Sequence, residues 1–387
     1  MFTNTPERET ATASRFVSRV LAVGVAVACV LAISGCSQAS GAEEPGSTPG
    51  SSTVDVSQYQ KTAEAGMAPI TEFPGPKTGP AAQPNKKVIF LACGFAGEGC
   101  LTAAQGAKTA GEALGWDVTL VDGKFDPQVF ARTIQQAIDQ KVDGIIIDAI
   151  DADAITGPIA KARAAGIVVG SYDSANTPSA TGVSFDVAVS FEKQGADLAS
   201  YMIWQTKGDA QPFILNSPEF KGTAIWTASA TKVFESCTSC KIAGTQDFTA
   251  GTAATQLPPL VVSEKQKTPG MNILLVPYDA AALPIIPSMK SAGILDQVKV
   301  GVFNATKPTV ELIRKGEESV AMAEPQAWGA WAAMDNMNRL FAGEDAVEQN
   351  IPIRLITEAN VDEIPAGEAW EGDLDFTAEY KKIWSGK

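Results

Sequence analysis

Short apolar runs alternate with amphipathic stretches from residue 87 onwards, and this alternation constrains the fold more than any other feature. Residues 88–92 and 144–148 are almost continuously apolar, whereas residues 127–140 carry apolar side chains at helical spacing. Strands that are buried on both faces and connected by helices are typical of parallel sheets. The other strands expected in this first half are residues 118–121, 167–171 and 182–185, and its other helices are residues 101–114 and 154–165.

The same rhythm is repeated in the second half of the chain. Residues 186–205 read as the helix that opens it. The further strands expected here are residues 213–216, 242–245, 273–276 and 298–303, and the helices between them are residues 224–235, 252–263 and 282–292. Residues 327–341 are expected to be helical, and residues 351–360 contain a final strand. Two successive units of this size predict two α/β lobes with parallel sheets rather than one large sheet.

Charge and histidine content exclude several classes of function. The 387 residues carry a formal net charge of −14, whereas a nucleic-acid-binding protein needs a basic surface. The chain has no histidine, so Ser-His-Asp and Cys-His catalytic arrangements and histidine metal sites are absent. These observations favour a protein that is not an enzyme and that needs neither cofactor nor metal.

The first 35 residues have the layout of a bacterial export signal. Three arginines precede the apolar residues 20–33, and this run is too short to span a bilayer comfortably. The run ends in Ser34-Gly35-Cys36, which resembles a lipobox, where the cysteine is lipidated after cleavage. We therefore expect an exported protein that Cys36 anchors to the outer face of the cytoplasmic membrane.

Five segments follow from these patterns. Residues 1–35 are the signal peptide, and residues 36–85, rich in Ser, Gly and Pro, are expected to be a flexible tether. The N-terminal lobe is predicted to comprise residues 86–186 plus 325–345, and the C-terminal lobe residues 187–324 plus 346–363. Residues 364–387 form a C-terminal extension whose aromatic side chains suggest that it packs onto the lobes.

Several stretches, in order, resemble the ribose/galactose-type periplasmic solute-binding proteins of ABC importers. Residues 115–155 are similar to the second and third βα units of that family, "ARAAGIVVGSYDS" to its fourth strand and ligand loop, and "VKVGVFNATKPTVELIRKGE" to a later segment. The resemblance implies two Rossmann-like lobes, a type I periplasmic-binding-protein fold, joined by three crossovers. It also implies a small-molecule ligand in the cleft and an ABC permease as partner, without nucleic acid.

Ligand contacts are expected beyond the carboxyl ends of the strands, where open α/β sheets bind their ligands. In the family, an aspartate is common at the position of Asp173, and Asn304 stands where an aspartate is usual. The alternative for Asp173 is a turn or cap aspartate, whereas Asp279 could equally be the N-cap of the following helix, and each aromatic residue could equally belong to a lobe core. The candidate ligand residues are Phe95, Glu98, Tyr172, Asp173, Phe220, Trp226, Tyr278, Asp279, Asn304, Glu324 and Gln326.

A neighbouring acidic stretch does not have the spacing of a calcium loop. Asp148, Asp151 and Asp153 lack the D-x-[DN]-x-[DN]-G pattern, and Asp153 reads as a helix N-cap.

The stretch "CGFAGEGC" at residues 93–100 follows the first expected strand. Its glycines form G-x-x-G-x-G rather than the dinucleotide order G-x-G-x-x-G, which argues against a nucleotide cradle. In an exported protein we expect the disulfides Cys93–Cys100 and Cys237–Cys240, the latter structural rather than redox-active. The loop lacks the pair of aromatic residues with which sugar-binding relatives stack on their ligand, which indicates a solute other than a simple sugar.

These features predict a monomeric solute-binding lipoprotein of an ABC import system. It would capture a small sugar-like or related cyclic organic solute by hinge closure, without catalysis. The alternative is a sensor that presents a small signal molecule to a membrane receptor.

Overall fold

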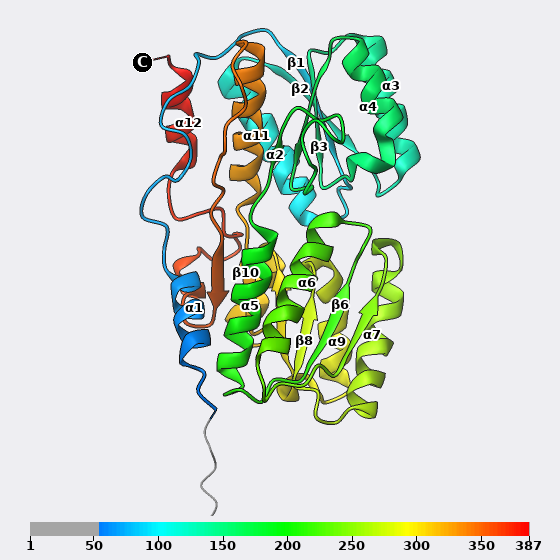
Figure 1. Ribbon diagram of the computed structural model, residues 1–387, viewed down its shortest axis with the longest axis vertical. Helices are drawn as coiled ribbons and strands as arrows, with labels where there is room; N and C mark the ends of the chain where they lie inside the picture. The colour runs from blue at the N-terminus through cyan, green and yellow to red at the C-terminus, as the bar shows by residue number, and fades with distance from the viewer. Residues whose placement is uncertain (1–53, 387) are drawn as a thin grey trace, which may run out of the picture. The chain divides into compact units, whose positions relative to one another are not determined.

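The computed structural model of the protein describes residues 54–386, in which two sheets form the framework (Figure 1). The N-terminal lobe contains a 5-stranded sheet of order β2-β1-β3-β4-β5, in which all pairs are parallel. The strands are β1 (Lys87–Ala92), β2 (Asp117–Asp122), β3 (Gly144–Asp148), β4 (Val168–Tyr172) and β5 (Asp186–Val187). The helices of this lobe are α2 (Glu98–Leu114), α3 (Pro127–Gln140), the 3-10 turn η1 (Ala152–Ile155), α4 (Thr156–Ala164) and α11 (Gln326–Phe341).

The C-terminal lobe contains a 6-stranded sheet of order β11-β10-β9-β8-β6-β7. Its strands are β6 (Pro212–Asn216), β7 (Gly244–Asp247), β8 (Ile273–Val276), β9 (Lys299–Phe303), β10 (Val320–Ala323) and β11 (Arg354–Thr357). Its helices are α5 (Phe191–Gln205), α6 (Lys221–Ser236), α7 (Ala250–Lys267), α8 (Asp279–Ala282), α9 (Ile285–Ser291) and α10 (Lys307–Arg314), with 3-10 turns η2 (Leu295–Gln297) and η3 (Val361–Glu363). The expectation of two α/β lobes is confirmed, although β11 runs antiparallel to β10.

Local sequence explains several boundaries. Asp126 caps α3 by accepting a hydrogen bond from the backbone N–H of Gln128, and Pro127 occupies the first turn, where its missing N–H costs nothing. Gly115 ends α2 in a left-handed conformation (φ 74°), which glycine adopts without a Cβ clash. In β3 every residue is buried, as its continuous apolar sequence predicts.

Three expectations about elements need correction. The strand expected at residues 182–185 is displaced to β5, because only Asp186 and Val187 pair with β4. Residues 186–205 are not one helix, since α5 begins at Phe191 after its N-cap, Ser190. Asp151, rather than Asp153, caps η1, because its carboxylate accepts from the backbone N–H of Asp153.

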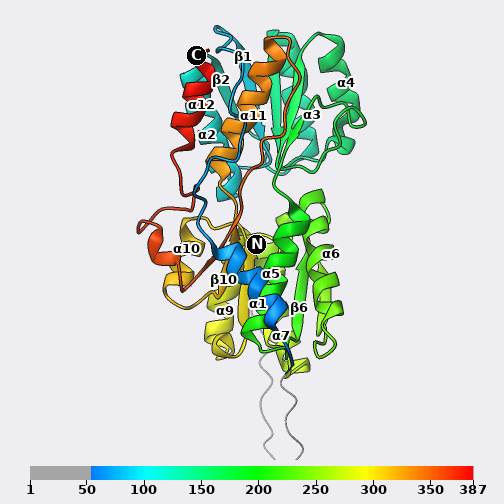
Figure 2. The ribbon, with the colours of Figure 1, turned by 60° about the vertical axis from the view of Figure 1, so that its left-hand side comes forward.

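The chain passes between the lobes at the three expected places and also at two others. It crosses from β5 to α5, from β10 to α11 and from α11 to β11. In addition, α1 (Ser57–Met67) packs on α5 and β11 of the C-terminal lobe, after which residues 68–86 lead to β1 of the other lobe (Figure 2). At the other end, Trp370 is buried in the C-terminal lobe, and α12 (Phe376–Trp384) packs on α11 and α2 of the N-terminal lobe.

These two additional segments correct the prediction that residues 36–85 form a flexible tether. Within the described part of that range, Tyr59, Ala63 and Phe73 are buried in the largest core cluster, so the segment gains apolar burial that its overall composition conceals. Phe73 stacks on Trp328 of α11, which in turn stacks on Phe376 of α12, with ring centroids 5.6 and 5.2 Å apart. The N- and C-terminal segments therefore pack on the same helix.

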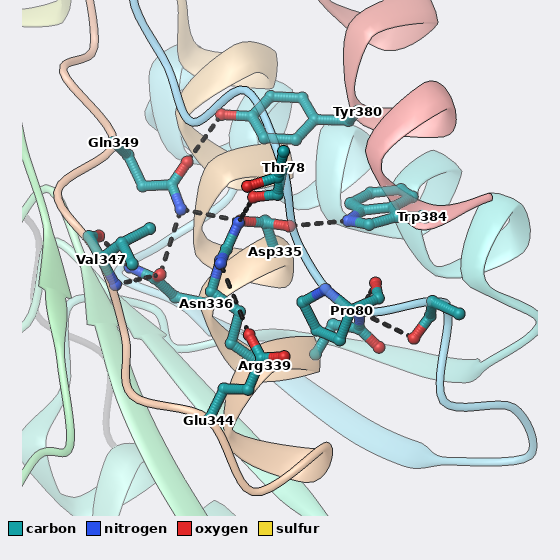
Figure 3. Close-up of polar contacts among 12 residues, drawn as sticks. Thr78, Pro80, Asp335, Asn336, Arg339, Glu344, Val347, Gln349, Tyr380 and Trp384 are labelled. Atoms are coloured by element: carbon teal, nitrogen blue, oxygen red, sulfur yellow. Dashed lines mark hydrogen bonds and ion pairs between the residues drawn. The ribbon is translucent and has the colours of Figure 1, made fainter. Parts of the chain in front are cut away.

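A buried polar network joins these segments to α11 (Figure 3). Asp335 is fully buried and accepts hydrogen bonds from Arg339 Nε at 2.8 Å, Gln349 Nε2 at 3.0 Å and Trp384 Nε1 at 2.8 Å. Arg339 also donates to the carbonyl of Thr78, and Tyr380 donates to Gln349. We call this network the hinge-side network.

Helices of residues 54–386 are all too short or too polar to cross a bilayer. The expected signal peptide and the expected lipidation site, Cys36, lie outside the described residues.

Candidate functional site

A cavity of about 310 Å³ lies where the carboxyl ends of strands from both sheets face one another. Loops after β1, β3 and β4 line it from the N-terminal lobe, and residues after β6, β8 and β9 line it from the C-terminal lobe. Open parallel sheets bind ligands at this edge, because the loops there are free to differ while the sheet holds them in place. Its titratable and polar lining side chains are Glu98, Asp148, Asp151, Asp173, Ser174, Lys221, Thr223, Tyr278, Asp279, Asn304 and Gln326.

Seven of the eleven residues predicted as ligand contacts line this cavity. They are Glu98, Asp173, Phe220, Tyr278, Asp279, Asn304 and Gln326. Both Asp173 and Asn304 follow directly on a strand, and both have left-handed backbones, with φ of 49° and 73°. Aspartate and asparagine tolerate this conformation better than other residues with a Cβ, which is consistent with their occurrence at these two positions.

The other four residues lie outside the cavity lining. Trp226 is fully buried in a lobe core and is therefore not a stacking surface for a ligand. Tyr172 is also fully buried, because the alternation along β4 points it away from the side that Asp173 faces. Its hydroxyl donates toward Glu324 Oε1 at 3.0 Å and Gln326 Oε1 at 3.1 Å.

Phe95 and Glu324 are the other two predicted contacts that lie outside the cavity lining. Phe95 packs against the large core cluster, and its backbone N–H donates to Asp122 Oδ1. Glu324 lies behind the cavity wall, with 2% of its surface exposed. Because both residues follow a strand, the sequence predicts them near the cleft. Position after a strand does not determine which side chains face the cavity.

Asp148 is not among the predicted ligand contacts, although it lines the cavity. It is the last residue of β3, 1% exposed, and its Oδ2 has no hydrogen-bond partner among residues 54–386. Asp173 Oδ1 is likewise buried without a partner in the described chain. Burial, and then the nearby Glu324, raise the pKa of both carboxyls well above the ordinary value. The sequence signal is its position at a strand end, which places residues 148–151 at the cleft but does not single out Asp148 as a contact.

Asp279 has a different environment from these two carboxyls. Its Oδ2 accepts hydrogen bonds from the backbone N–H and hydroxyl of Thr306, so it fixes the loop after β9. It is the first residue of α8 and not its N-cap, which is Tyr278. Burial raises the pKa of Asp279 to about 6, against the opposing effect of the Thr306 hydrogen bonds.

Several residues that line the cavity also form contacts between the lobes. The rings of Phe125 and Phe220 meet edge to face with centroids 6.4 Å apart, and Phe220 meets Tyr278 in the same way at 5.9 Å. Lys221 Nζ lies 2.8 Å from Asp151 Oδ1 and 2.5 Å from Asp153 Oδ2. Lys221 ends the stretch 217–221, which follows a strand and is expected at the cleft, but it is not among the predicted contacts. Phe125 is not predicted, because nothing in the sequence around it distinguishes it from a surface residue.

Both expected disulfides are present. Cys93–Cys100 lines the cavity next to Asp148, whose carboxylate lies within 4.8 Å of the sulfur atoms. Because both sulfurs are in the disulfide, they provide no thiolate ligands for a metal ion. Cys237–Cys240 lies just after α6, outside the cavity lining.

Comparison with known proteins identifies the family. The model of the periplasmic binding protein domain matches residues 90–345, more than half of the chain. The chain belongs to this periplasmic binding protein family. Members of the family bind solutes for transport and are not enzymes.

Individual relatives of this periplasmic binding protein are distant. A D-apiose import binding protein from Actinobacillus succinogenes is 25% identical over 227 residues, which cover 58% of this chain and 72% of that protein. A solute-binding protein from Agrobacterium vitis with bound allitol has a TM-score of 0.65 at 19% identity, covering 72% of this chain and 97% of that one. One from Burkholderia graminis, in complex with D-arabinose, has a TM-score of 0.67 at 18% identity, covering 73% and 98%. These likenesses confirm the type I fold.

Proposed function

We propose that the protein is an extracytoplasmic solute-binding lipoprotein of an ABC import system that captures a small polyhydroxylated solute. The observation that carries the proposal is the cavity between the lobes, lined by polar strand-end residues of both. Its volume of about 310 Å³ suits a molecule of the size of a monosaccharide, alditol or cyclitol. The sugars and alditol named for three relatives support the same class of ligand.

Binding is coupled to closure of the lobes. Asp173 and Asp148 belong to one lobe and Asn304 to the other, so a ligand that contacts all three stabilises the closed state more than the open one. Phe125–Phe220 and Lys221 with its two carboxylates form only when the lobes are close together. A membrane permease that recognises the paired lobes would then distinguish the loaded from the empty protein.

A thermal-shift screen over pentoses, hexoses, alditols and cyclitols tests this function. A ligand present at 100 times its Kd is expected to stabilise the protein by about 2.7 kcal/mol. The variants Asp173→Asn and Asn304→Ala should each weaken the best hit at least tenfold, whereas Asp139→Asn, exposed on α3, should not. If no compound shifts the melting temperature, or if the site variants bind as tightly as wild type, the proposal is wrong.

The lipid anchor needs a separate test. In the full chain expressed in a bacterium, the wild-type protein should incorporate labelled palmitate and sediment with membranes. Cys36→Ala should do neither. Equal membrane association of the two proteins, without label, would contradict anchoring at this cysteine.

A further inference from the structure

The cavity is rich in acidic side chains. Five carboxylates line it, and they belong to Glu98, Asp148, Asp151, Asp173 and Asp279. Among the described lining residues, Lys221 is the one basic side chain, and its ammonium group already contacts Asp151 and Asp153. A ligand with a negative group would therefore meet repulsion at the floor of this cavity, without a basic side chain there to oppose it.

The unpartnered polar atoms of the lining also favour a ligand group that has several hydrogens to donate. Ser174 and Thr223 line the cavity, but their hydroxyls already donate to backbone carbonyls. The hydroxyl of Ser174 donates to the carbonyl of Tyr172 at 2.7 Å, and that of Thr223 donates to the carbonyl of Ser217. The unpartnered buried polar atoms of the lining are Asp148 Oδ2, Asp173 Oδ1 and the hydroxyl of Tyr278. Against the two carboxyl oxygens a ligand hydroxyl has one hydrogen to donate, whereas an ammonium group has three.

The burial of Asp148 and Asp173 also favours a positively charged group on the ligand. Asp148 is 1% exposed, and Glu324, also buried, lies close enough to oppose its ionisation. Bringing like charges together out of water is unfavourable unless a partner of opposite sign is present. Within residues 54–386, no basic side chain supplies that partner to Asp148, so the charge has to come with the ligand.

The aromatic part of the cavity wall is suited to an ammonium group. Phe125, Phe220 and Tyr278 form a continuous edge-to-face row at the cavity, and Phe191 and Phe303 line it as well. Aromatic faces attract cations when water is excluded. An anion or a strongly hydrated neutral group gains nothing comparable from these rings.

We propose that the solute carries a protonated amine, which lies against Asp148 and Asp173, on a polyhydroxylated or cyclic frame. Amino sugars, amino alditols and aminocyclitols are the compounds of this class. The inference rests on the proposed function, because it takes the cleft as the solute site and adds the group that selects the solute.

Matched triples of compounds test the proposal by isothermal titration calorimetry on wild-type protein at pH 7.5. Each triple contains a hydroxyl parent, its amino-deoxy form and the N-acetyl form, for example glucose, glucosamine and N-acetylglucosamine, or the galactose series. Sorbitol with 1-amino-1-deoxysorbitol and inositol with an inosamine extend the set. In at least one triple or pair the amine should bind at least tenfold more tightly than its neutral counterparts.

The outcomes separate this inference from the proposed function. If neutral members bind as tightly as the amines or more tightly, the amine proposal is wrong while the function stands. If no member of any set binds, the polyhydroxylated class is wrong and the amine proposal falls with it.

A variant pair locates the amine. Asp148→Asn keeps the size of the side chain but removes its charge, so the preference for the amine over its parent should fall at least tenfold. Affinity for the neutral parent should fall less than affinity for the amine does, because the amide still offers an acceptor oxygen to a hydroxyl. Asp139→Asn, the same change on the exposed face of α3, should retain the full preference. If Asp148→Asn fails to fold, as judged by circular dichroism, Asp173→Asn provides the same comparison. An undiminished preference in the folded variant would overturn the assignment.

Discussion

Two buried aspartates of the N-terminal lobe have contrasting surroundings. Asp335, in the hinge-side network, accepts from Arg339, Gln349 and Trp384, so both of its oxygens are satisfied (Figure 3). Asp148, at the cavity floor, has an oxygen without any partner among the described residues. Both side chains are almost fully removed from water, with exposures of 0% and 1%.

The difference indicates what each region contributes. A buried charge with complete partners fixes one arrangement of the segments that carry them, whereas a buried charge without partners costs stability until another molecule supplies them. The hinge side is therefore built for a fixed geometry, and the cleft is built to be completed by its ligand. Variants on each side should reveal opposite effects on the free energy of unfolding.

Removal of the Asp335 carboxylate should have the largest effect. Asp335→Ala leaves Arg339 buried with its main partner gone, and the loss of a partner from a buried pair typically costs about 3–5 kcal/mol. Urea denaturation followed by tryptophan fluorescence measures the change. A loss of less than 1 kcal/mol would mean that the network relaxes or that water replaces the carboxylate.

Asp279 should make stability depend on pH. Burial raises its pKa in the folded protein to about 6, above the ordinary value of 3.8 for an aspartate. The group therefore contributes stability that is fully present below about pH 4 and is lost as the pH rises through 6. This loss amounts to about 3 kcal/mol by pH 7.

Asp279→Asn should accordingly show a flatter dependence of unfolding free energy on pH between 4 and 7 than wild type. Asp139→Asn, which is exposed, should follow the wild-type curve. Parallel curves for wild type and Asp279→Asn would show that the folded carboxyl titrates normally.

The two disulfides should differ in their effect on function more than in their effect on stability. Replacement of Cys93 and Cys100 by serine should cost about 2.5 kcal/mol, and replacement of Cys237 and Cys240 about 2 kcal/mol, because both close short loops. Only the first pair lines the cavity, so only its loss should also weaken ligand binding. Equal affinities in the two double variants would contradict a role of the Cys93–Cys100 loop in the site.

Asp148→Asn should stabilise the protein in the absence of ligand. Replacement of an unfavourably buried acidic side chain at a functional site commonly yields about 1 kcal/mol. Chemical denaturation without ligand at pH 7.5 measures this gain, with Asp335→Asn as the counterpart from the hinge side, which should lose stability. A destabilised Asp148→Asn would show that the carboxylate has a structural partner after all.

Lys221→Gln should have the smallest effect on stability, below 1 kcal/mol, because its two ion pairs are partly exposed. Its effect should instead be on lobe closure, since these pairs join residues of opposite lobes. Small-angle scattering of the ligand-free variant should give a larger radius of gyration than wild type. An unchanged radius together with unchanged affinity would mean that the pairs do not favour the closed state.

The sequence predicts the alternating strands and helices that form the framework of the two lobes. The expected residues 127–140 and 273–276 agree with α3 and β8 at both ends, because continuous apolar runs and helical spacing report burial directly. Helices α1 and α12 were not assigned, since both become stable only by packing on elements far away in the chain, such as α5 and α11. Strand β10 is likewise not predicted from the sequence, although Glu324, the residue that follows it, is among the predicted ligand contacts.

The candidate site was predictable at the level of loops rather than side chains. Strand ends correctly brought Asp173, Tyr278 and Asn304 to one cavity. They do not distinguish Asp173, which lines the cavity, from Tyr172, the last residue of the preceding strand, nor do they identify Trp226 as a core residue. Which way a side chain points depends on register and on packing with α11, where Gly329 leaves room for the Tyr172 ring.

The additional crossings of the chain affect the entropy of the open state. With residues 68–86 and the chain between Trp370 and α12 joining the lobes alongside the three expected segments, the separated lobes can adopt fewer relative orientations. Closure then removes less orientational freedom than it would in a protein with three connections only. A smaller share of the ligand's interaction energy is spent on ordering the lobes, so a small solute with few contacts can still hold them together.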